Sequence, residues 1–344
     1  MRIAVLGAGL AIAATVRLTA TALPSSSREH RDPGPLRGVP LPRRTGLRLV
    51  VAGNPPFALD VDSGRTVALP RVPVLRHGVQ SVVGVDGRGA VVVAESVWHR
   101  AMLFAVRGRA RRVSPLGIGA EVVSAGGGAS VWIKRFSTRT RCTLARVRLD
   151  GMARRAARPI RCASTISPGG SLGLVVGRTR LVDPATGRTR LRTRWGIVAA
   201  AGRSLVLAGP RQTLTVVDAR SGRERRIRRP RTVGGLDTPA VDPRGRFVAL
   251  AFANPTWNGE QALDVWVLDT KTARLEQVPG MPVLVALKLT SMAWTRDGRL
   301  VVLGRRKERD FVAVWRAGQR RLAVKSVRLS ERASNGSDTF AVVS

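Results

Sequence analysis

The stretch GRFVALAF, at residues 245–252, is a glycine and an arginine followed by an unbroken apolar run. An apolar run of this length that starts at a glycine predicts a buried strand entered from a tight turn. The pattern occurs seven times, and its aligned glycines are 32 to 53 residues apart, with a mean of about 42. Repetition at this period is typical of solenoids and propellers. The other copies are GLRLVVAG (46–53), GRGAVVVAE (87–95), GGASVWIKR (127–135), GGSLGLVVG (169–177), GRSLVLAG (202–209) and GRLVVLG (298–304).

Each copy is followed by a second strand that ends in a Gly- and Asp-rich turn, as in LTVVDARSGR (214–223). A basic third strand follows, as in RERRIRRPR (223–231), and another strand precedes the glycine, as in TPAVDPRG (238–245). A β-sandwich would need about seven strands in total, and no unit shows the 3.6-residue period of a helix. The sequence therefore predicts an all-β, seven-bladed β-propeller with four-stranded antiparallel blades.

The segments VDPRGRFVALAF (241–252), LDVWVLDTKTARLEQV (263–278) and SMAWTRDGRLVVLG (291–304) resemble the blades of TolB-like and WD-repeat-like bacterial propellers. The resemblance covers about residues 45–344, and it implies a propeller fold and a protein that binds a partner. The Gly-His and Trp-Asp dipeptides of true WD repeats are absent from this sequence, which disfavours that branch.

The two ends of the repeat region predict how the ring closes. The first copy, GLRLVVAG, follows a segment rich in Pro and Arg, so its blade lacks an innermost strand. An extra strand, DTFAVVS (338–344), follows the last copy and can fill that gap, which leaves no open edge. By strand alternation, Phe340 and Val342 would then face one neighbouring blade, and Thr339, Ala341 and Val343 the other.

The N-terminal segment predicts export. Residues 1–22 have a minimal basic start, a fourteen-residue apolar run and a small-residue cleavage pattern that ends at Ala22, as a signal peptide does. Residues 23–44 are a Pro/Ser/Arg-rich linker, and residues 45–344 are the propeller. Arg17, after the apolar run, leaves an uncleaved anchor as an alternative. VLGAGLA imitates a dinucleotide-binding turn, but Ile12 occupies the third glycine position and no second strand follows.

Cys142 and Cys162 are the only cysteines, and they flank a hairpin whose turn is Asp150-Gly151-Met152. They are symmetric about Met152, so the sequence predicts that they are direct cross-strand partners joined by a disulfide. Two free thiols are the alternative. A metal site is disfavoured because no histidine lies nearby. The predicted location is secreted, or on the extracellular face of the cell envelope.

Three loops after the second strands of their blades combine aromatic, polar and cationic residues, at 96–100, 254–260 and 305–309. Tryptophan beside arginine or asparagine suits the recognition of a sugar or an anion, although solvated loops with a packing tryptophan are the alternative. The predicted ligand-binding residues are Trp98, His99, Arg100, Asn254, Trp257, Asn258, Arg305 and Arg306.

The sequence contains only incomplete matches to catalytic and metal-binding motifs. Residues 169–173, GGSLG, match the nucleophile elbow G-x-S-x-G, but that motif needs a later histidine, and His30, His77 and His99 all come earlier. Asp60 and Asp62 lack the other ligands of a calcium loop. We therefore predict no catalytic residues, no metal and no cofactor.

Lys and Arg number 59 against 22 acidic residues, a net charge of +37, whereas the 44% apolar content excludes wholesale disorder. Residues 220–231 hold seven arginines and one glutamate, and residues 107–112 and 154–158 are similar. All three segments fall on predicted outer strands or the turns that lead to them. They could form a cationic belt for an anionic surface, or they could prevent pairing between sheet edges.

The sequence therefore predicts a secreted or cell-surface propeller that binds a protein or an anionic cell-envelope polymer without catalysis. We expect a monomer with peripheral contact to a membrane surface and no specific nucleic-acid partner, because no nucleic-acid module is visible. The alternative is an extracellular propeller hydrolase or lyase that acts on a polysaccharide or a small molecule. Acids or His99 gathered at the mouth of the central channel would favour that alternative.

Overall fold

The computed structural model describes residues 33, 36–75, 78–96, 101–126, 128–151, 153–228, 231–256, 259–286, 291–307, 309–329 and 340–343. The contacts divide the chain into residues 1–31 and residues 32–344, and the fold given below is that of the second unit. The predicted signal peptide and most of the following linker lie outside the described residues. In the part that is described, no helix is long and apolar enough to cross a membrane.

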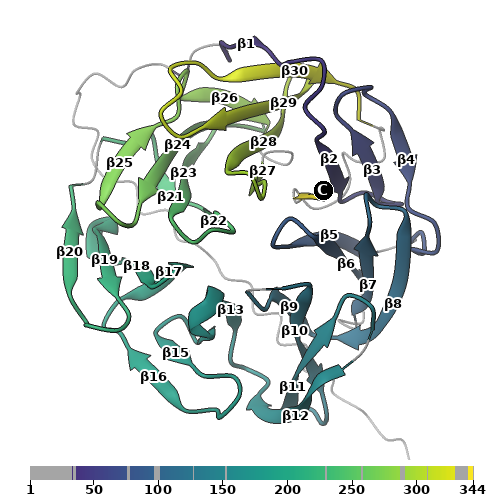
Figure 1. Cartoon of the computed structure of the whole chain (residues 1–344), viewed down its shortest axis with the longest axis vertical. Coiled ribbons are helices and arrows are strands. Elements are labelled where there is room, and N and C mark those ends of the chain that lie inside the picture. The colour runs from purple at the N-terminus through teal and green to yellow at the C-terminus, as the bar shows by residue number, and fades with distance from the viewer. Residues whose placement is uncertain are drawn as a thin grey trace, which may run out of the picture. The chain divides into compact units, whose positions relative to one another are not determined.

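The strands form seven antiparallel sheets arranged as blades around a ring, which confirms the predicted propeller (Figure 1). From the inner to the outer strand, blade 1 is β31 (Phe340–Val342), β2 (Arg48–Val51), β3 (Phe57–Asp60) and β4 (Thr66–Ala68). Blade 2 is β5 (Gly78–Val85), β6 (Gly89–Ser96), β7 (Ala101–Arg107) and β8 (Arg112–Gly119). Blade 3 is β9 (Glu121–Ser124), β10 (Ser130–Phe136), β11 (Arg141–Arg148) and β12 (Ala153–Arg161).

The remaining blades follow in chain order. Blade 4 is β13 (Ile166–Pro168), β14 (Leu174–Val176), β15 (Arg180–Val182) and β16 (Thr189–Arg192), and blade 5 is β17 (Gly196–Ala201), β18 (Ser204–Ala208), β19 (Leu214–Asp218) and β20 (Glu224–Ile227). Blade 6 has an interrupted inner strand, β21 (Gly235–Leu236) and β22 (Ala240–Val241), then β23 (Phe247–Pro255), β24 (Glu260–Asp269) and an interrupted outer strand, β25 (Arg274–Gln277) and β26 (Val283–Ala286). Blade 7 is β27 (Ser291–Trp294), β28 (Arg299–Arg306), β29 (Arg309–Arg316) and β30 (Ala323–Val327).

The repeated glycines occupy turns that require positive φ. Gly202 has φ 58° and Gly245 has φ 71°, a region that other residues adopt at a cost. These two glycines belong to neighbouring blades, and a Cβ on Gly202 would lie 2.6 Å from the carbonyl oxygen of Gly245. The repeat therefore keeps glycine both for the turn and for the close approach of adjacent inner turns. Gly127, the copy in blade 3, lies outside the described residues.

The C-terminal strand closes the ring as predicted. β31 pairs antiparallel with β2, with Val342 opposite Leu49. Phe340 and Val342 pack with the apolar residues of blade 7, whereas Ala341 and Val343 pack with those of blade 2. The predicted alternation of these four side chains is confirmed, and Thr339 lies outside the described residues.

A further strand was not expected from the sequence. β1 (Val39–Pro40) pairs parallel with β30 on the outer edge of blade 7, and the amide of Val39 donates to the carbonyl of Leu322 at 2.8 Å. These residues belong to the segment that the sequence assigns to a linker. A two-residue strand among prolines and arginines has no alternation that could predict it.

The apolar core lies in the seams between adjacent blades, and these seams differ in extent. The seam between blades 6 and 7 contains sixteen buried residues, including Trp294, Leu300 and Trp315. The seam between blades 3 and 4 contains seven. Three of the four strands of blade 4 are only three residues long, so this blade has less surface with which to cover blade 3.

Candidate functional site

Three of the eight predicted ligand-binding residues lie in the described part of the chain. Trp98, His99, Arg100, Trp257 and Asn258 lie outside the described residues. The three described residues occupy neighbouring blades: Asn254 is exposed near the end of β23, and Arg305 and Arg306 are half-buried at the end of β28. The sugar- or anion-binding role of these loops stays a prediction.

Arg305 has a structural partner. Its Nε lies 2.7 Å from Oδ1 of Asp310, which is 5% exposed. Oδ2 of Asp310 also accepts the backbone amide of Leu329 at 3.0 Å. This pair connects the second and third strands of blade 7 to the chain that follows β30. The guanidinium of Arg305 therefore already has a structural role.

The disulfide is present, but the predicted register is wrong. Cys142 and Cys162 are bonded, with their Cα atoms 5.0 Å apart. Cys142 lies opposite Ile160 in the ladder, and the amide of Cys162 bonds to the carbonyl of Thr140, so the cysteines are diagonal neighbours. Val147 pairs with Ala153, so the hairpin is centred on Asp150 and not on Met152. Irregularities between Leu144 and Val147 then shift the register by two residues, which places Cys142 opposite Ile160.

A buried lysine holds the connection from blade 3 to blade 4. Lys134 is 2% exposed, and its Nζ lies 2.6 Å from Oε1 of Glu121 and 3.0 Å from the carbonyl oxygens of Cys162 and Ser164. Oε2 of Glu121 accepts the amide of Ile166 at 3.0 Å. A buried ammonium is costly unless it is fully paired, and here every partner fixes this connection. The only sequence signal was a single lysine in the apolar run at 127–135.

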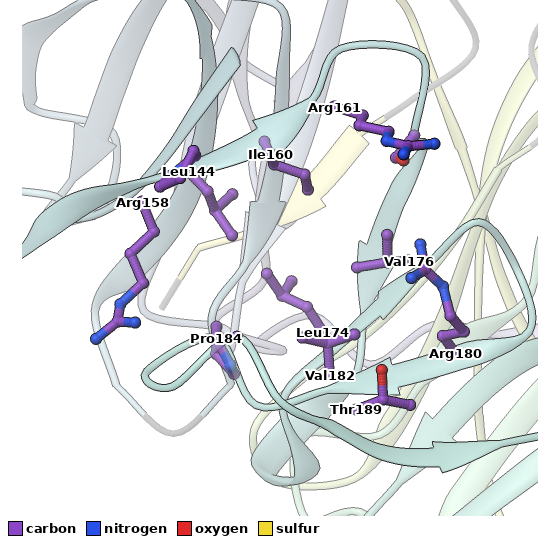
Figure 2. A pocket seen from close by; sticks show the side chains of 13 residues that line it. Leu144, Arg158, Ile160, Arg161, Leu174, Val176, Arg180, Val182, Pro184 and Thr189 are labelled. Atoms are coloured by element: carbon purple, nitrogen blue, oxygen red, sulfur yellow. The ribbon is translucent and has the colours of Figure 1, made fainter. Parts of the chain in front are cut away.

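Beside this connection, a cavity of about 420 Å³ opens in the seam between blades 3 and 4 (Figure 2). Strands β11 and β12 form one wall, and blade 4 forms the other. The sequence does not predict this cavity, because the cavity results from the short strands of blade 4. The lining residues are Leu144, Arg158, Pro159, Ile160, Arg161, Ser164, Leu174, Val176, Arg180, Val182, Pro184, Gly187 and Thr189.

Strand register explains why the cavity is both apolar and cationic. On blade 4, Leu174 pairs with Val182 and Val176 pairs with Arg180, and directly paired residues share a face of the sheet. On blade 3, Leu144 pairs with Arg158. Each wall therefore presents apolar side chains and an arginine on the same face of its sheet.

Arginines at the cavity also oppose other arginines. Arg180 lies directly across the ladder from Arg192, and Arg161 lies across from Arg141. Like charges in such positions destabilise a sheet. No carboxylate is among the described residues that line the cavity, so a bound anion would relieve both repulsions.

A wider cationic surface surrounds the cavity. We call the outer strands of blades 3, 4 and 5 (β12, β16 and β20) the arginine belt; they follow one another around the rim of the ring (Figure 1). Their sequences contain eight arginines and one glutamate. The outer strands of the other four blades, β4, β8, β25 with β26, and β30, contain three basic residues and one acid.

Some belt arginines are engaged by the fold. Arg190 bonds to Asp183 at 2.8 Å, and this hydrogen bond holds the pKa of Asp183 below its usual range. Arg225 caps the neighbouring blade by donating to the carbonyl oxygens of Thr270 and Lys271. Arg192 and Arg226, by contrast, are exposed.

The acids near the inner turns have structural partners. Asp86 accepts hydrogen bonds from Ser124 and Gly128 at 3.2 Å. Asp297 pairs with Arg299 and Arg316. Asp242 caps its own turn through the amide of Arg244, and burial raises its pKa.

The two other candidate motifs are ordinary turns. Ser171 lies in the 3-10 turn η1 (Gly170–Leu172), and its hydroxyl donates to the carbonyl of Gly202, so the strand-to-helix elbow of a hydrolase is not formed. Asp60 accepts the amide and the hydroxyl of Ser63 at 3.0 Å. Across the described ranges, no group of three or more His, Cys, Asp or Glu residues is placed to hold a metal.

No family model and no curated protein matches this sequence. The solved structures to which the fold is similar include TolB from Acinetobacter baumannii, at 12% identity and a TM-score of 0.44 over 90% of this chain and 67% of that chain. A provisionally assigned TolB from Agrobacterium tumefaciens has 12% identity and a TM-score of 0.40, with 81% and 88% of the two chains covered. A Bacteroides fragilis protein with a provisional assignment as a 6-phosphogluconolactonase has 14% identity and a TM-score of 0.48, with 89% and 100% covered.

The seven four-stranded blades establish the propeller fold by themselves. Nothing about function follows from likenesses at such low identity.

Proposed function

We propose that this chain is an exported binding protein whose arginine belt holds an anionic polymer of the cell envelope, without catalysis. The observation that carries the proposal is the single-sign charge on three adjacent outer strands, eight arginines against one glutamate. A polymer with regularly spaced negative charges could contact the three strands in succession and gain from each contact.

The uneven distribution favours a belt over protection of sheet edges. Protection is needed at every outer strand and works with charge of either sign. β4, the outer strand of blade 1, is Thr-Val-Ala and carries no charge, although it too is an outermost strand. Charge concentrated on blades 3 to 5 is therefore better explained by an anionic partner.

The disulfide supports the location, since such bonds persist in oxidising compartments outside the cytoplasm. The hydrolase or lyase alternative gains no support from the described residues, because Asp86, Asp242 and Asp297 at the inner turns each accept hydrogen bonds from the surrounding fold.

The test compares two triple variants of the full chain with equal loss of charge. Arg226 of β20 is changed to Gln in the first, together with Arg188 and Arg223, which directly precede the belt strands β16 and β20; all three are exposed. Arg274, Arg320 and Arg321, exposed in blades 6 and 7, are changed to Gln in the second. Binding to fluorescent long-chain polyphosphate is measured by anisotropy over a range of salt, with neutral dextran as the control polymer.

The belt variant should bind about tenfold more weakly and with a shallower dependence on salt, because three local contacts to the polymer are lost. The blade 6–7 variant should stay within about twofold of the unaltered chain. Equal weakening of both variants would show that net charge alone governs binding, and the belt would then have no role.

A further inference from the structure

We propose that the cavity between blades 3 and 4 binds a single-chain amphiphilic anion, with its acyl chain along the apolar wall of blade 4 and its carboxylate or phosphate held by Arg161 and Arg180. The arginine belt proposal concerns a charged polymer on the outer surface. The cavity proposal goes beyond it and does not depend on it.

The apolar part of the cavity suits a hydrocarbon chain. Leu144 and Leu174 are buried, and Val182 and Pro184 are half-buried, yet all four line the open space. A volume of about 420 Å³ is within the range of pockets that enclose small ligands. The parts of Val182 and Pro184 that remain exposed to water carry a free-energy cost that a bound acyl chain would remove.

The two proposed anion-binding arginines lie at the same end of the seam. Arg161 is the last residue of β12, directly before the connection to blade 4, and Arg180 is the first residue of β15. Successive strands alternate in direction, so the end of a fourth strand and the start of a third strand fall on the same face of the ring. Arg161 and Arg180 also lie on the same side of the cavity in Figure 2.

The opposite end of the cavity is lined by Pro184 and Gly187, from the turn between β15 and β16, and by Thr189, the first residue of β16. Arg158 of β12 lies on the side of Pro184 (Figure 2). The cavity therefore has two arginines at one end, an apolar wall and a single further arginine on the other side. An inorganic anion would leave the apolar wall exposed, and an uncharged alcohol would leave the opposed arginines unrelieved, so the amphiphile fits best.

The anion-binding end is held in place before any ligand arrives. The disulfide anchors Cys162 beside Arg161, and Lys134 holds the carbonyl oxygens of Cys162 and Ser164. A wall fixed in this way loses little conformational entropy on binding, which favours affinity.

Calorimetric titration of the purified full chain with monomeric dodecanoate tests the proposal, with dodecanol and inorganic phosphate as comparison ligands. Dodecanoate should bind at least about tenfold more tightly than dodecanol, and phosphate should bind more weakly than either. Equal affinity for dodecanoate and dodecanol would overturn the role of the arginines. Equal affinity for dodecanoate and phosphate would overturn the role of the apolar wall.

Variants locate the ligand. Arg161→Gln and Arg180→Gln should each weaken dodecanoate binding about tenfold, since each removes a charge-assisted hydrogen bond. Arg274→Gln, an exposed residue of blade 6 outside both the belt and the cavity, is the matched control and should change binding less than about twofold. If Arg274→Gln weakens binding as much as Arg180→Gln does, the ligand is not in this cavity.

Thr189→Trp tests the apolar end. Thr189 is exposed, so the indole can be accommodated without repacking the core, and the unfolding midpoint of the variant checks this. The variant should lose dodecanoate binding and keep polyphosphate binding, which separates the cavity from the belt. Unchanged dodecanoate binding by Thr189→Trp would overturn the proposed path of the chain.

The same ligand chemistry occurs in free fatty acids and in membrane lipids. Co-sedimentation with phosphatidylglycerol vesicles distinguishes these two sources. If Thr189→Trp reduces sedimentation, the cavity takes an acyl chain from a membrane. If it reduces only the binding of monomeric dodecanoate, the cavity takes a free amphiphile, and either result supports the proposed site.

Discussion

Blade 4 and blade 6 have the same topology but different strand lengths. Long strands fill the seam with the next blade and stabilise the fold, whereas short strands leave space in which a ligand could bind. β23 and β24 of blade 6 have nine and ten residues, and the seam with blade 7 is filled by Trp294, Leu300 and Trp315. β14 and β15 of blade 4 have three residues each, and the seam with blade 3 is left partly open. Shortening the strands of one blade thus creates a cavity within a repeat fold.

The outer strands of the two blades also differ in charge. The outer strand of blade 6 balances Arg274 with Glu276. The outer strand of blade 4, Thr189–Arg192, has two arginines and no acid. The blade with the open seam is also the blade that would attract an anion, so we expect binding functions at blade 4 and stabilising functions at blade 6.

The largest expected effect concerns closure of the ring, on which both blades depend. Deleting residues 338–344 removes β31, which packs with blade 7 through Phe340 and Val342 and with blade 2 through Ala341 and Val343. The product should aggregate or be poorly secreted, because two seams lose their contacts at once. Size-exclusion chromatography and thermal melting measure the effect.

The control for this deletion is removal of residues 25–31, in the segment that the sequence predicts to be a linker. That chain should melt like the unaltered protein. If the C-terminal deletion also melted normally, each seam would be stable on its own, and β31 would have no role in closure.

Matched leucine truncations compare the two seams directly. Leu300→Ala, in the filled seam of blades 6 and 7, should cost about 4 kcal/mol of unfolding free energy, whereas Leu144→Ala, beside the cavity, should cost about 2 kcal/mol. Leu144 already has open space on one side, so its truncation removes fewer contacts. Urea unfolding of both variants measures the difference, and equal costs would show that the seam at blade 4 is closed in solution.

The features that the sequence predicted correctly are those that follow from the repeat spacing and from the alternation of apolar residues along strands. The spacing of the glycine-led runs predicted seven blades, and the unmatched strand at 338–344 predicted closure, because each depends on local pattern alone. The cavity arises because the strands of blade 4 are shorter than those of blade 3. Such a difference between two neighbouring blades cannot be recognised from the pattern of either blade alone. The cysteine register depends on where the hairpin is centred, at Asp150 instead of Met152, and on the irregularities between Leu144 and Val147, and the residue pattern shows neither.

Removal of the disulfide tests the rigidity of the open seam. Cys142→Ser with Cys162→Ser should lower stability by about 3 kcal/mol, the chain-entropy value for a loop of this length. The loosened connection should also weaken dodecanoate binding, since Arg161 directly precedes Cys162. Chemical unfolding and calorimetry of the double variant measure both effects, and stability loss with unchanged affinity would show that Lys134 alone fixes the anion-binding end.

The smallest expected effect uses two aspartates whose pKa values are shifted in opposite directions. In blade 4, a hydrogen bond from Arg190 lowers the pKa of Asp183, so its contribution to stability is present above about pH 4 and is lost as the pH falls. In blade 6, burial raises the pKa of Asp242. Folding therefore favours the protonated form of Asp242, and stability is lost as the pH rises through its folded pKa.

The variants Asp183→Asn and Asp242→Asn should therefore change the melting temperature with opposite signs near neutral pH. Asp183→Asn should lower it by about 1 °C, because an exposed ion pair is lost. Asp242→Asn should raise it by about 2 °C, because the amide oxygen still accepts from Arg244 while the buried charge is gone. The difference for Asp242→Asn should vanish toward about pH 3, where this carboxyl is protonated in the unaltered chain, whereas the difference for Asp183→Asn should fade only at lower pH because the pKa of Asp183 is lowered. Melting curves over this pH range measure the effect, and a lower melting temperature for Asp242→Asn near neutral pH would show that the charge of this blade 6 turn stabilises the fold.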